Sequence, residues 1–419
     1  MNEFTRATSI LALSVIVALG SQRTNAAEPA VISDSQVCPP TGKVGPTSWL
    51  LPPGYLHTAG SQIVDEAGGP VRIASVGWNQ GFEDPVAAMR KIMQTGFNAV
   101  RFSWVDATMQ SDLRTIDGIV AAAGRFGVKV ILDHHTNEAG TAADGWGAQQ
   151  QNGLWFDSGP ATDGTNGAGV KGTVTKAIFQ SHWVEVAKRY AGNSTVIGFD
   201  LHNEPLMIRG GSTWGDGGVT DIRLMYQTVG NAILAVNPGA LIIAEGPQNY
   251  SGDKPWGDLS KVRSAPVELD VPNKVVYSVH DYPAYVSGVR EDSGPRKVAR
   301  MNRAWGYLVS ENIAPVWIGE MGANFDGSWG REKVAGSRAW ASNLVDYLNG
   351  KLSDQGGPSF TGSQQGVSTD WWAWGYLPGQ SLNGTLGVDG SPRPAQFAVY
   401  HQLQPHAVCG TSSRRAAVE

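Results

Sequence analysis

Short apolar segments recur along this chain and alternate with stretches in which apolar residues return every three or four positions. Strands buried on both faces have near-continuous apolar sequences, and eight such runs predict strands at residues 71–78, 97–103, 128–134, 196–203, 240–246, 275–280, 315–320 and 371–375. Helical spacing predicts helices at residues 86–95, 113–126, 174–190, 222–235, 296–310 and 332–348. Between the fifth and sixth strands, Gly, Pro and Ser interrupt the helical pattern.

The alternation of eight strands with helices predicts a (β/α)8 TIM barrel, an α/β fold, as a single domain. Asp84 followed by Pro85 is typical of a helix start, and Gly96 of a helix end. An open doubly wound sheet is disfavoured, because no Gly-x-Gly-x-x-Gly motif opens a helix after the first strand. We therefore place the barrel domain at residues 56–410, after a Pro-rich extension at 27–55 and before a tail at 411–419.

The N-terminal residues have the pattern of a secretory signal peptide. Arg6 precedes an apolar run at 10–19, and small and polar residues follow as far as Ala26. This run is too short to span a membrane as a stable helix. We expect a signal peptide at 1–26, cleavage near Ala26 or Ala27, and a secreted (extracellular or periplasmic) protein with no membrane association after cleavage.

The chain contains two cysteines, Cys38 and Cys409, which lie near the two ends of the expected mature protein. In an oxidising compartment an isolated pair favours a disulfide over two free thiols. The first and last elements of a closed barrel are neighbours, so this bond would tie the ends together. Neither cysteine has a second Cys or a His at ligand spacing, and a zinc site is therefore not expected.

Composition narrows the class of partner. The net charge of −5 is dispersed along the chain, which argues against nucleic acid and anionic membranes. The 15 Trp and 53 Gly are the unusual counts. Several Trp must belong to the core, but Trp residues on Gly-rich loops suit a cleft that binds flat, partly apolar ligands such as sugar rings.

Polar side chains gather where the predicted strands end, and active sites of such barrels lie at this C-terminal end. They are Arg101, Trp104, Asp133, His134, His135, His202, Asn203, Glu204, Glu245, His280, Asp281, Tyr282 and Glu320, together with the run WWAWG at 371–375. The opposite strand ends are mostly apolar or loop-like. Clustering at one end only indicates a functional site rather than structural capping.

Two carboxylates in this set, Glu204 and Glu320, would project into the mouth of the barrel from opposite walls. Retaining glycosidases use such a pair, with the carboxyl groups about 5–5.5 Å apart, one as nucleophile and one as acid/base. Glu245 and Asp281 are alternative candidates. We interpret Glu245 mainly as a partner that contacts the catalytic pair.

The neighbouring polar residues suit the same chemistry. The Asn203 amide is placed to bind a sugar 2-hydroxyl, a contact that strengthens in the transition state. Arg101 would keep the nucleophile ionised, and His280 and Tyr282 would tune the site through hydrogen bonds.

The motifs GFDLHNEP, VILDHH, VYSVHDY, APVWIGEMG and NAVRFSW resemble those of glycoside hydrolase family 5, the cellulase family, in consistent order over about residues 60–404. The resemblance implies that Glu204 is the general acid/base and Glu320 the nucleophile. It also implies a surrounding set of residues: Arg101, His135, Asn203, His280, Tyr282 and Trp372. The Asp-x-His spacing selects His135 over His134, and Trp372 fits better than Trp371 or Trp374. Gly375 departs from the family, which often has Asn there.

Long loops after the strands supply candidate substrate contacts. The longest, about residues 136–172, carries Trp146, Trp155 and Phe156, and the next two loops carry Trp214 and Trp256. We expect Trp155 and Trp214 to stack on glucosyl units; the alternative is a surface flap with its own small core. An open Trp-lined groove favours internal cleavage of a linear β-1,4-glucan.

Other functions remain as alternatives. The resemblance also covers β-mannanases and other β-glycanases. A metal-dependent barrel hydrolase could use His134, His135, His202 and His280, but the His-x-His expected at the end of its first strand is replaced by Gly77-Trp78-Asn79. A non-catalytic glycan-binding barrel is disfavoured because both carboxylates are present. We expect an endo-1,4-β-glucanase that binds β-glucan, acts as a monomer and needs no cofactor or metal.

Overall fold

The computed structural model describes residues 49–78, 84–137, 149–167, 169–207, 210–248, 257–377, 382 and 384–405. The expected signal peptide, the two cysteines Cys38 and Cys409, and the loop residues Trp146 and Trp256 lie outside the described residues.

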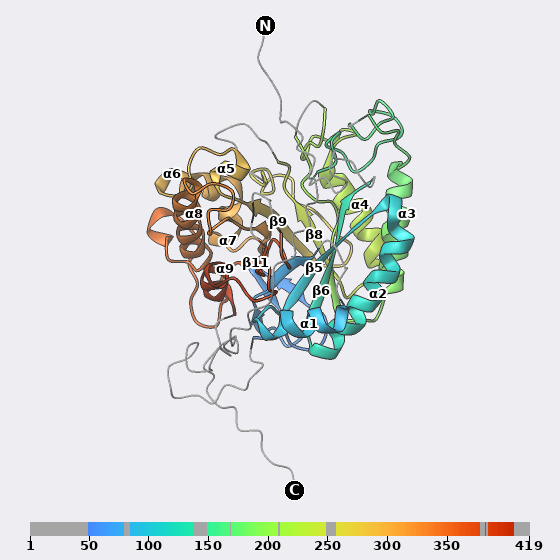
Figure 1. The fold of residues 1–419 in the computed structure, drawn as a ribbon. Coiled ribbons are helices and arrows are strands. Elements are labelled where there is room, and N and C mark those ends of the chain that lie inside the picture. Colours follow the sequence, from blue (N-terminus) through green and yellow to red (C-terminus); the bar gives the residue numbers. More distant parts are fainter. Residues whose placement is uncertain are drawn as a thin grey trace, which may run out of the picture.

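Eight parallel strands close into a barrel whose order is β10-β11-β4-β5-β6-β7-β8-β9 (Figure 1). The strands are β4 (Ala74–Trp78), β5 (Ala99–Val105), β6 (Lys129–Thr136), β7 (Val196–Asp200), β8 (Leu241–Glu245), β9 (Val275–Asp281), β10 (Val316–Met321) and β11 (Ser368–Trp371). Sequential strands are neighbours around the barrel, as parallel strands joined by helices must be. The predicted (β/α)8 TIM barrel is confirmed.

Helices pack around the outside of the barrel (Figure 1). They are α1 (Pro85–Gln94), α2 (Met109–Phe126), α3 (Lys176–Arg189), α4 (Ile222–Leu234), α5 (Ala284–Ser287), α6 (Pro295–Met301), α7 (Tyr307–Ser310), α8 (Lys333–Leu348) and α9 (Pro394–Tyr400). Asp84 caps α1 as predicted, because its side chain accepts the backbone N–H groups of Val86 and Ala87. The helix predicted at 296–310 is α6 and α7, joined by the π-helical turn Asn302–Gly306.

A small antiparallel sheet lies at the N-terminal end of the barrel. It contains β1 (His57–Ala59), β2 (Gln62–Val64) and β3 (Pro70–Val71). Ile63 of this sheet joins Leu51 and Leu56 in an apolar cluster with the inward-facing strand residues Ile131 and Trp317. In the part of the chain that the structure describes, this cluster fills the N-terminal end of the barrel interior.

Three predicted strand boundaries are wrong. The run at 71–78 contains two strands, because β3 pairs in the small sheet and β4 in the barrel. The fourth barrel strand ends at Asp200 rather than at Asn203. The eighth is Ser368–Trp371, not 371–375, because buried polar residues of the barrel interior interrupt the apolar pattern there.

Two further features concern the helices. In the part of the segment between β8 and β9 that the structure describes, no α-helix occurs, in line with its interrupted pattern. Among the described helices, none has the length and apolar character needed to cross a membrane.

Candidate active site

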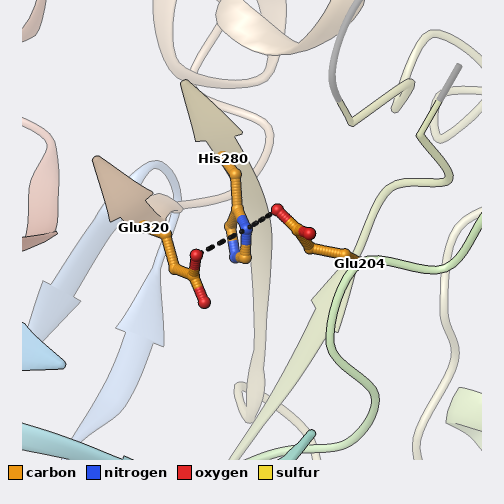
Figure 2. Close-up of side chains that lie close together, drawn as sticks. All are labelled: Glu204, His280 and Glu320. Atoms are coloured by element: carbon orange, nitrogen blue, oxygen red, sulfur yellow. Dashed lines mark hydrogen bonds and ion pairs between the residues drawn. The ribbon is translucent and has the colours of Figure 1, made fainter. Parts of the chain in front are cut away.

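Three side chains converge at the C-terminal end of the barrel. Figure 2 shows Glu204, which follows β7, His280 of β9 and Glu320 of β10 directed toward one another. One carboxylate oxygen of each glutamate and one ring nitrogen of His280 all lie within 4.8 Å of one another. All three side chains are buried.

The Arg101 guanidinium holds the polar floor of this site together. It is fully buried and donates from Nη1 to Glu320 Oε1 at 2.7 Å, from Nε to Asp200 at 2.9 Å and from Nη2 to Asn203 Oδ1 at 2.8 Å. Nη2 also lies 2.9 Å from Asp133. Because its fork is planar and rigid, one residue fixes the relative positions of groups on β5, β6, β7 and β10.

Two hydrogen-bond donors hold the carboxylate of Glu320. The Tyr282 hydroxyl donates to Oε2 at 2.6 Å, and Arg101 donates to Oε1. Together the two contacts fix the orientation of the carboxylate.

Glu204 has the surroundings of a general acid. Burial raises the pKa of its carboxyl group above the ordinary value, although amide hydrogen bonds, including one from Gln149, oppose the shift. Glu204 Oε1 lies 2.8 Å from Nδ1 of His280. Burial lowers the pKa of His280 to about 3, so this imidazole is neutral and brings no positive charge that would ionise Glu204. Two carboxylates with opposed environments are the arrangement that separates an acid from a nucleophile.

The backbone of Glu204 is also unusual. Its φ of 46° lies in the left-handed region. This conformation costs a non-glycine residue about 1–3 kcal/mol and persists only where the surrounding structure holds it. The N–H of Glu204 donates to Glu245 Oε2 at 2.8 Å, and the N–H of Asn203 donates to the carbonyl of His134 at 2.9 Å. The strained turn therefore sets the direction of the Glu204 side chain, while the N–H groups of Asn203 and Glu204 keep their hydrogen-bond partners.

An aromatic surface borders the carboxylate pair. Trp372 is half-buried, its ring stacks on His135 at 5.7 Å with 9° between the planes, and Arg101 lies over it at 6.0 Å. His135 is oriented by Asp133 at 2.7 Å. Trp371, by contrast, is buried against the helices, so Trp372 is the better placed of the two to meet a sugar ring.

Comparison with known proteins assigns this site to a family. The family model for cellulase (glycosyl hydrolase family 5) matches residues 64–377, and these include every residue of the site described above. The chain belongs to glycosyl hydrolase family 5. It is 33% identical over 337 residues to an endoglucanase of Paenibacillus polymyxa, which covers 70% of this chain and 77% of that protein.

Other members of family 5 resemble the chain more distantly. The major extracellular endoglucanase of Xanthomonas campestris pv. campestris is 26% identical over 390 residues, which cover 81% of this chain and 73% of that protein. Among solved structures, the hyperthermophilic endocellulase of Pyrococcus horikoshii is 25% identical, with a TM-score of 0.64 over 84% of this chain and 98% of that chain.

The expectation that Trp155 and Trp214 stack on substrate is wrong. Their side chains are only 3% and 1% exposed. Trp155 packs edge-on against Phe156 with Lys176 over its ring, and Trp214 donates through its indole N–H to the carbonyl of Ala265. These loops thus bury their aromatic residues in the large apolar cluster between the barrel and its helices, rather than in a small core of their own.

Among the described residues of this family 5 barrel, two aromatic side chains on the segments after β10 and β11 are exposed. Trp329, in the segment after β10, is 42% exposed, and Tyr376, in the segment after β11, is 44% exposed. Asp326 and Arg393 form an ion pair, and Arg393 also lies over the Tyr376 ring, so the two segments are tied together. Because Trp329 and Tyr376 follow the seventh and eighth barrel strands, the sequence could have predicted that they lie at the C-terminal end of the barrel. Gln149 is one of three consecutive Gln, and nothing in the sequence indicated its contact with Glu204.

The alternative catalytic and metal sites fit the structure less well. Asp281 faces the helices, where its carboxylate accepts hydrogen bonds from the Lys297 ammonium at 2.9 Å and from the indole N–H of Trp340 at 2.6 Å. His134 is held by Asp106 at 2.5 Å and lies 3.4 Å from His202, but within the described residues neither histidine belongs to a group compact enough to hold a metal ion.

Within the described residues, Glu204, His280 and Glu320 are the group that is compact enough to hold a metal ion. The Arg101 guanidinium, however, already places a positive charge 2.7 Å from Glu320. This charge disfavours a bound divalent cation. The arrangement of Glu204 and Glu320 is better suited to a pair of carboxyl groups that act in acid/base and nucleophilic chemistry.

Proposed function

We propose that this protein is a retaining endo-β-1,4-glucanase that hydrolyses internal bonds of cellulose or a related β-glucan by double displacement. The observation that carries the proposal is the short separation of the Glu204 and Glu320 carboxylate oxygens, within 4.8 Å. This spacing suits the direct attack of a retaining enzyme; an inverting enzyme needs a gap of about 6.5–9.5 Å for a water molecule.

In the first step, Glu320 attacks the anomeric carbon while Glu204 protonates the leaving oxygen. Arg101 and Tyr282 hold the Glu320 carboxylate in a fixed orientation through hydrogen bonds to its two oxygens. The raised pKa of Glu204 keeps its proton available for the leaving group. The products are a glycosyl-enzyme and the released chain end.

In the second step, Glu204, now a carboxylate, takes a proton from water, and that water attacks the anomeric carbon from the face the leaving group vacated. The bond to Glu320 breaks, and the sugar leaves with the β-configuration it had in the substrate. Because esterified Glu320 carries no charge, it no longer opposes the ionisation of Glu204.

Several observations support a β-glucan as substrate. The relatives compared above are named endoglucanases, and one solved neighbour is an endocellulase. The half-buried Trp372 and the exposed rings of Trp329 and Tyr376 offer stacking surfaces on the β10 and β11 side of the barrel mouth. Surfaces spread along an open mouth suit a polymer bound across the site.

We further propose that the protein is exported after removal of residues 1–26, that Cys38 and Cys409 form a disulfide, and that it acts as a monomer. The signal-like sequence supports the export, and the isolated cysteine pair supports the disulfide. N-terminal sequencing of the exported protein, mass spectrometry of unreduced peptides and sedimentation would test them in turn.

The proposed function is tested by a panel of carboxymethylcellulose, mixed-linkage glucan, mannan and xyloglucan, with product lengths recorded. We expect the highest kcat/KM on a β-1,4-glucan and a mixture of oligosaccharides from the earliest times. Glu204→Gln and Glu320→Gln should each lower kcat by at least about 10²-fold while oligosaccharide binding is kept. The matched control is Glu268→Gln, at an exposed position. Preference for mannan would refute the glucanase assignment.

A further inference from the structure

Glu245 contacts the acid/base from two directions, although it faces no substrate. It is the last residue of β8 and is fully buried. Its Oε2 accepts the backbone N–H of Glu204 at 2.8 Å and lies 3.5 Å from Nε2 of His280. The other nitrogen of His280 contacts Glu204 Oε1 at 2.8 Å. Glu245 therefore reaches both the backbone and, through the imidazole, the carboxyl group of Glu204.

The position of Glu245 is itself fixed on two sides. The Tyr226 hydroxyl donates to the Glu245 carbonyl at 2.9 Å, and the Glu245 N–H donates to the same hydroxyl at 3.1 Å. Gln248 Nε2 donates to Oε1 at 3.0 Å, and the Gln248 N–H donates to the carbonyl of Pro205 at 2.7 Å. The segment that follows Glu204 is thus tied to the segment that follows Glu245.

We propose that Glu245 is a positioning residue for the acid/base, which it holds in the left-handed backbone conformation and aligns through His280. The inference rests on the proposed retaining mechanism. Without the acceptor at Oε2, the Glu204 N–H would lose its partner at a φ of 46°, and the turn could relax to an ordinary conformation. The carboxyl group would then move away from the leaving oxygen.

The charge of Glu245 matters as well as its geometry. Burial raises its pKa well above the ordinary range, and the nearby carboxyl groups of Glu204 and Asp200 add to the effect, while Arg101 opposes it. His280 on β9 is neutral, and the Tyr226 hydroxyl on α4 carries no charge, since burial raises its pKa. A neutral Glu245 accepts the Glu204 N–H without placing a second negative charge beside Glu204 once that residue has given up its proton.

The test compares Glu245→Ala with the wild type on two aryl β-cellobiosides. Phenyl is a poor leaving group and needs the proton of Glu204, whereas dinitrophenyl leaves without it. We expect kcat/KM to fall roughly 10²-fold on the phenyl compound and less than about 5-fold on the dinitrophenyl compound. The alkaline limb of the phenyl pH profile should move to lower pH, because a Glu204 carboxyl group that is less deeply buried has a lower pKa.

A second variant separates positioning from general damage to the fold. Glu245→Gln keeps a neutral acceptor for the Glu204 N–H, so we expect it to restore most of the activity lost in Glu245→Ala and to leave the alkaline limb in place. Glu268→Ala, at an exposed position, is the matched control.

Equal losses on both cellobiosides in Glu245→Ala, or a Glu245→Gln variant as impaired as Glu245→Ala, would overturn the positioning role. A wild-type enzyme that hydrolyses neither cellobioside would instead overturn the proposed function and this inference with it.

Discussion

Replacing Arg101 by Met removes the one guanidinium that contacts Asp133, Asp200 and Glu320, while nearly keeping the side-chain volume. All of these groups are buried, so the variant leaves carboxylates in the barrel without their cation. Removal of one partner of a buried ion pair typically costs about 3–5 kcal/mol. We therefore expect the free energy of unfolding at neutral pH to fall by about that amount, together with a large loss of kcat.

The loss should depend on pH. Burial alone would raise the pKa of Asp133, but Arg101 and His135 outweigh it and hold this pKa well below its ordinary range. In the wild type this depressed pKa contributes stability that is present above the unfolded value of about 4 and is lost only as pH falls below it. Without Arg101, we expect burial to outweigh the remaining contacts with His135 and Ser103, so that the folded-state pKa of Asp133 rises above the unfolded value. The variant then loses stability as pH rises, so the difference from the wild type grows between about pH 5 and pH 8.

Urea denaturation of both proteins at these two pH values measures the effect. Arg263→Met, which breaks an exposed pair with Glu311, is the matched control and should cost less than about 1 kcal/mol at either pH. A loss in Arg101→Met no larger than in this control, or one that is the same at both pH values, would refute the role of Arg101 as the counter-charge of the buried carboxylates.

Three further outcomes are expected. Trp214→Ala should lower the free energy of unfolding by about 3–5 kcal/mol in urea denaturation without changing KM, because its ring is in the core. Trp329→Ala and Tyr376→Ala should each raise KM for soluble β-glucan roughly fivefold in reducing-sugar assays, as expected from the loss of about 1 kcal/mol of stacking. Dialysis against EDTA should leave the hydrolysis rate unchanged, because Arg101 already provides the positive charge beside Glu320.

Each of these outcomes has a result that contradicts it. A stable Trp214→Ala protein with a raised KM would return Trp214 to the substrate cleft. For the exposed rings the control is Val388→Ala, another exposed position, and an unchanged KM in both aromatic variants would place the polymer elsewhere. Loss of activity with EDTA and its recovery on adding a divalent cation would favour the metal-dependent alternative.

Much of the fold is predictable because each barrel strand is buried on both faces, so its sequence is an apolar run. The eighth barrel strand is an exception. In β11, Ser368, Thr369 and Asp370 are polar yet buried, since part of the barrel interior is a polar layer near Arg101. An apolar pattern cannot locate a strand that faces such a layer, and the prediction moved to the tryptophans that follow.

The two carboxylates that we propose as the catalytic pair could be located from the sequence, because Glu204 and Glu320 follow apolar runs and parallel strands bring their C-terminal ends together. The aromatic contacts could not, because a Trp on a Gly-rich loop has the same local sequence whether it faces the core, like Trp155, or solvent, like Trp329. The left-handed turn at Glu204 could not be predicted either, because it is held by contacts between strands that are distant in sequence, such as the hydrogen bond from the Glu204 N–H to Glu245.

The proposed retaining mechanism is tested most directly by the anomeric configuration of the first product. This configuration can be followed by proton NMR during hydrolysis of a β-1,4-linked oligosaccharide. One carboxylate oxygen of Glu204 lies within 4.8 Å of one of Glu320, which suits direct attack by Glu320 rather than by a water held between the two, so we predict that the new reducing end appears as the β-anomer. The α-anomer should then grow in only at the rate of mutarotation. Initial release of the α-anomer would contradict the double displacement and the assigned role of Glu320.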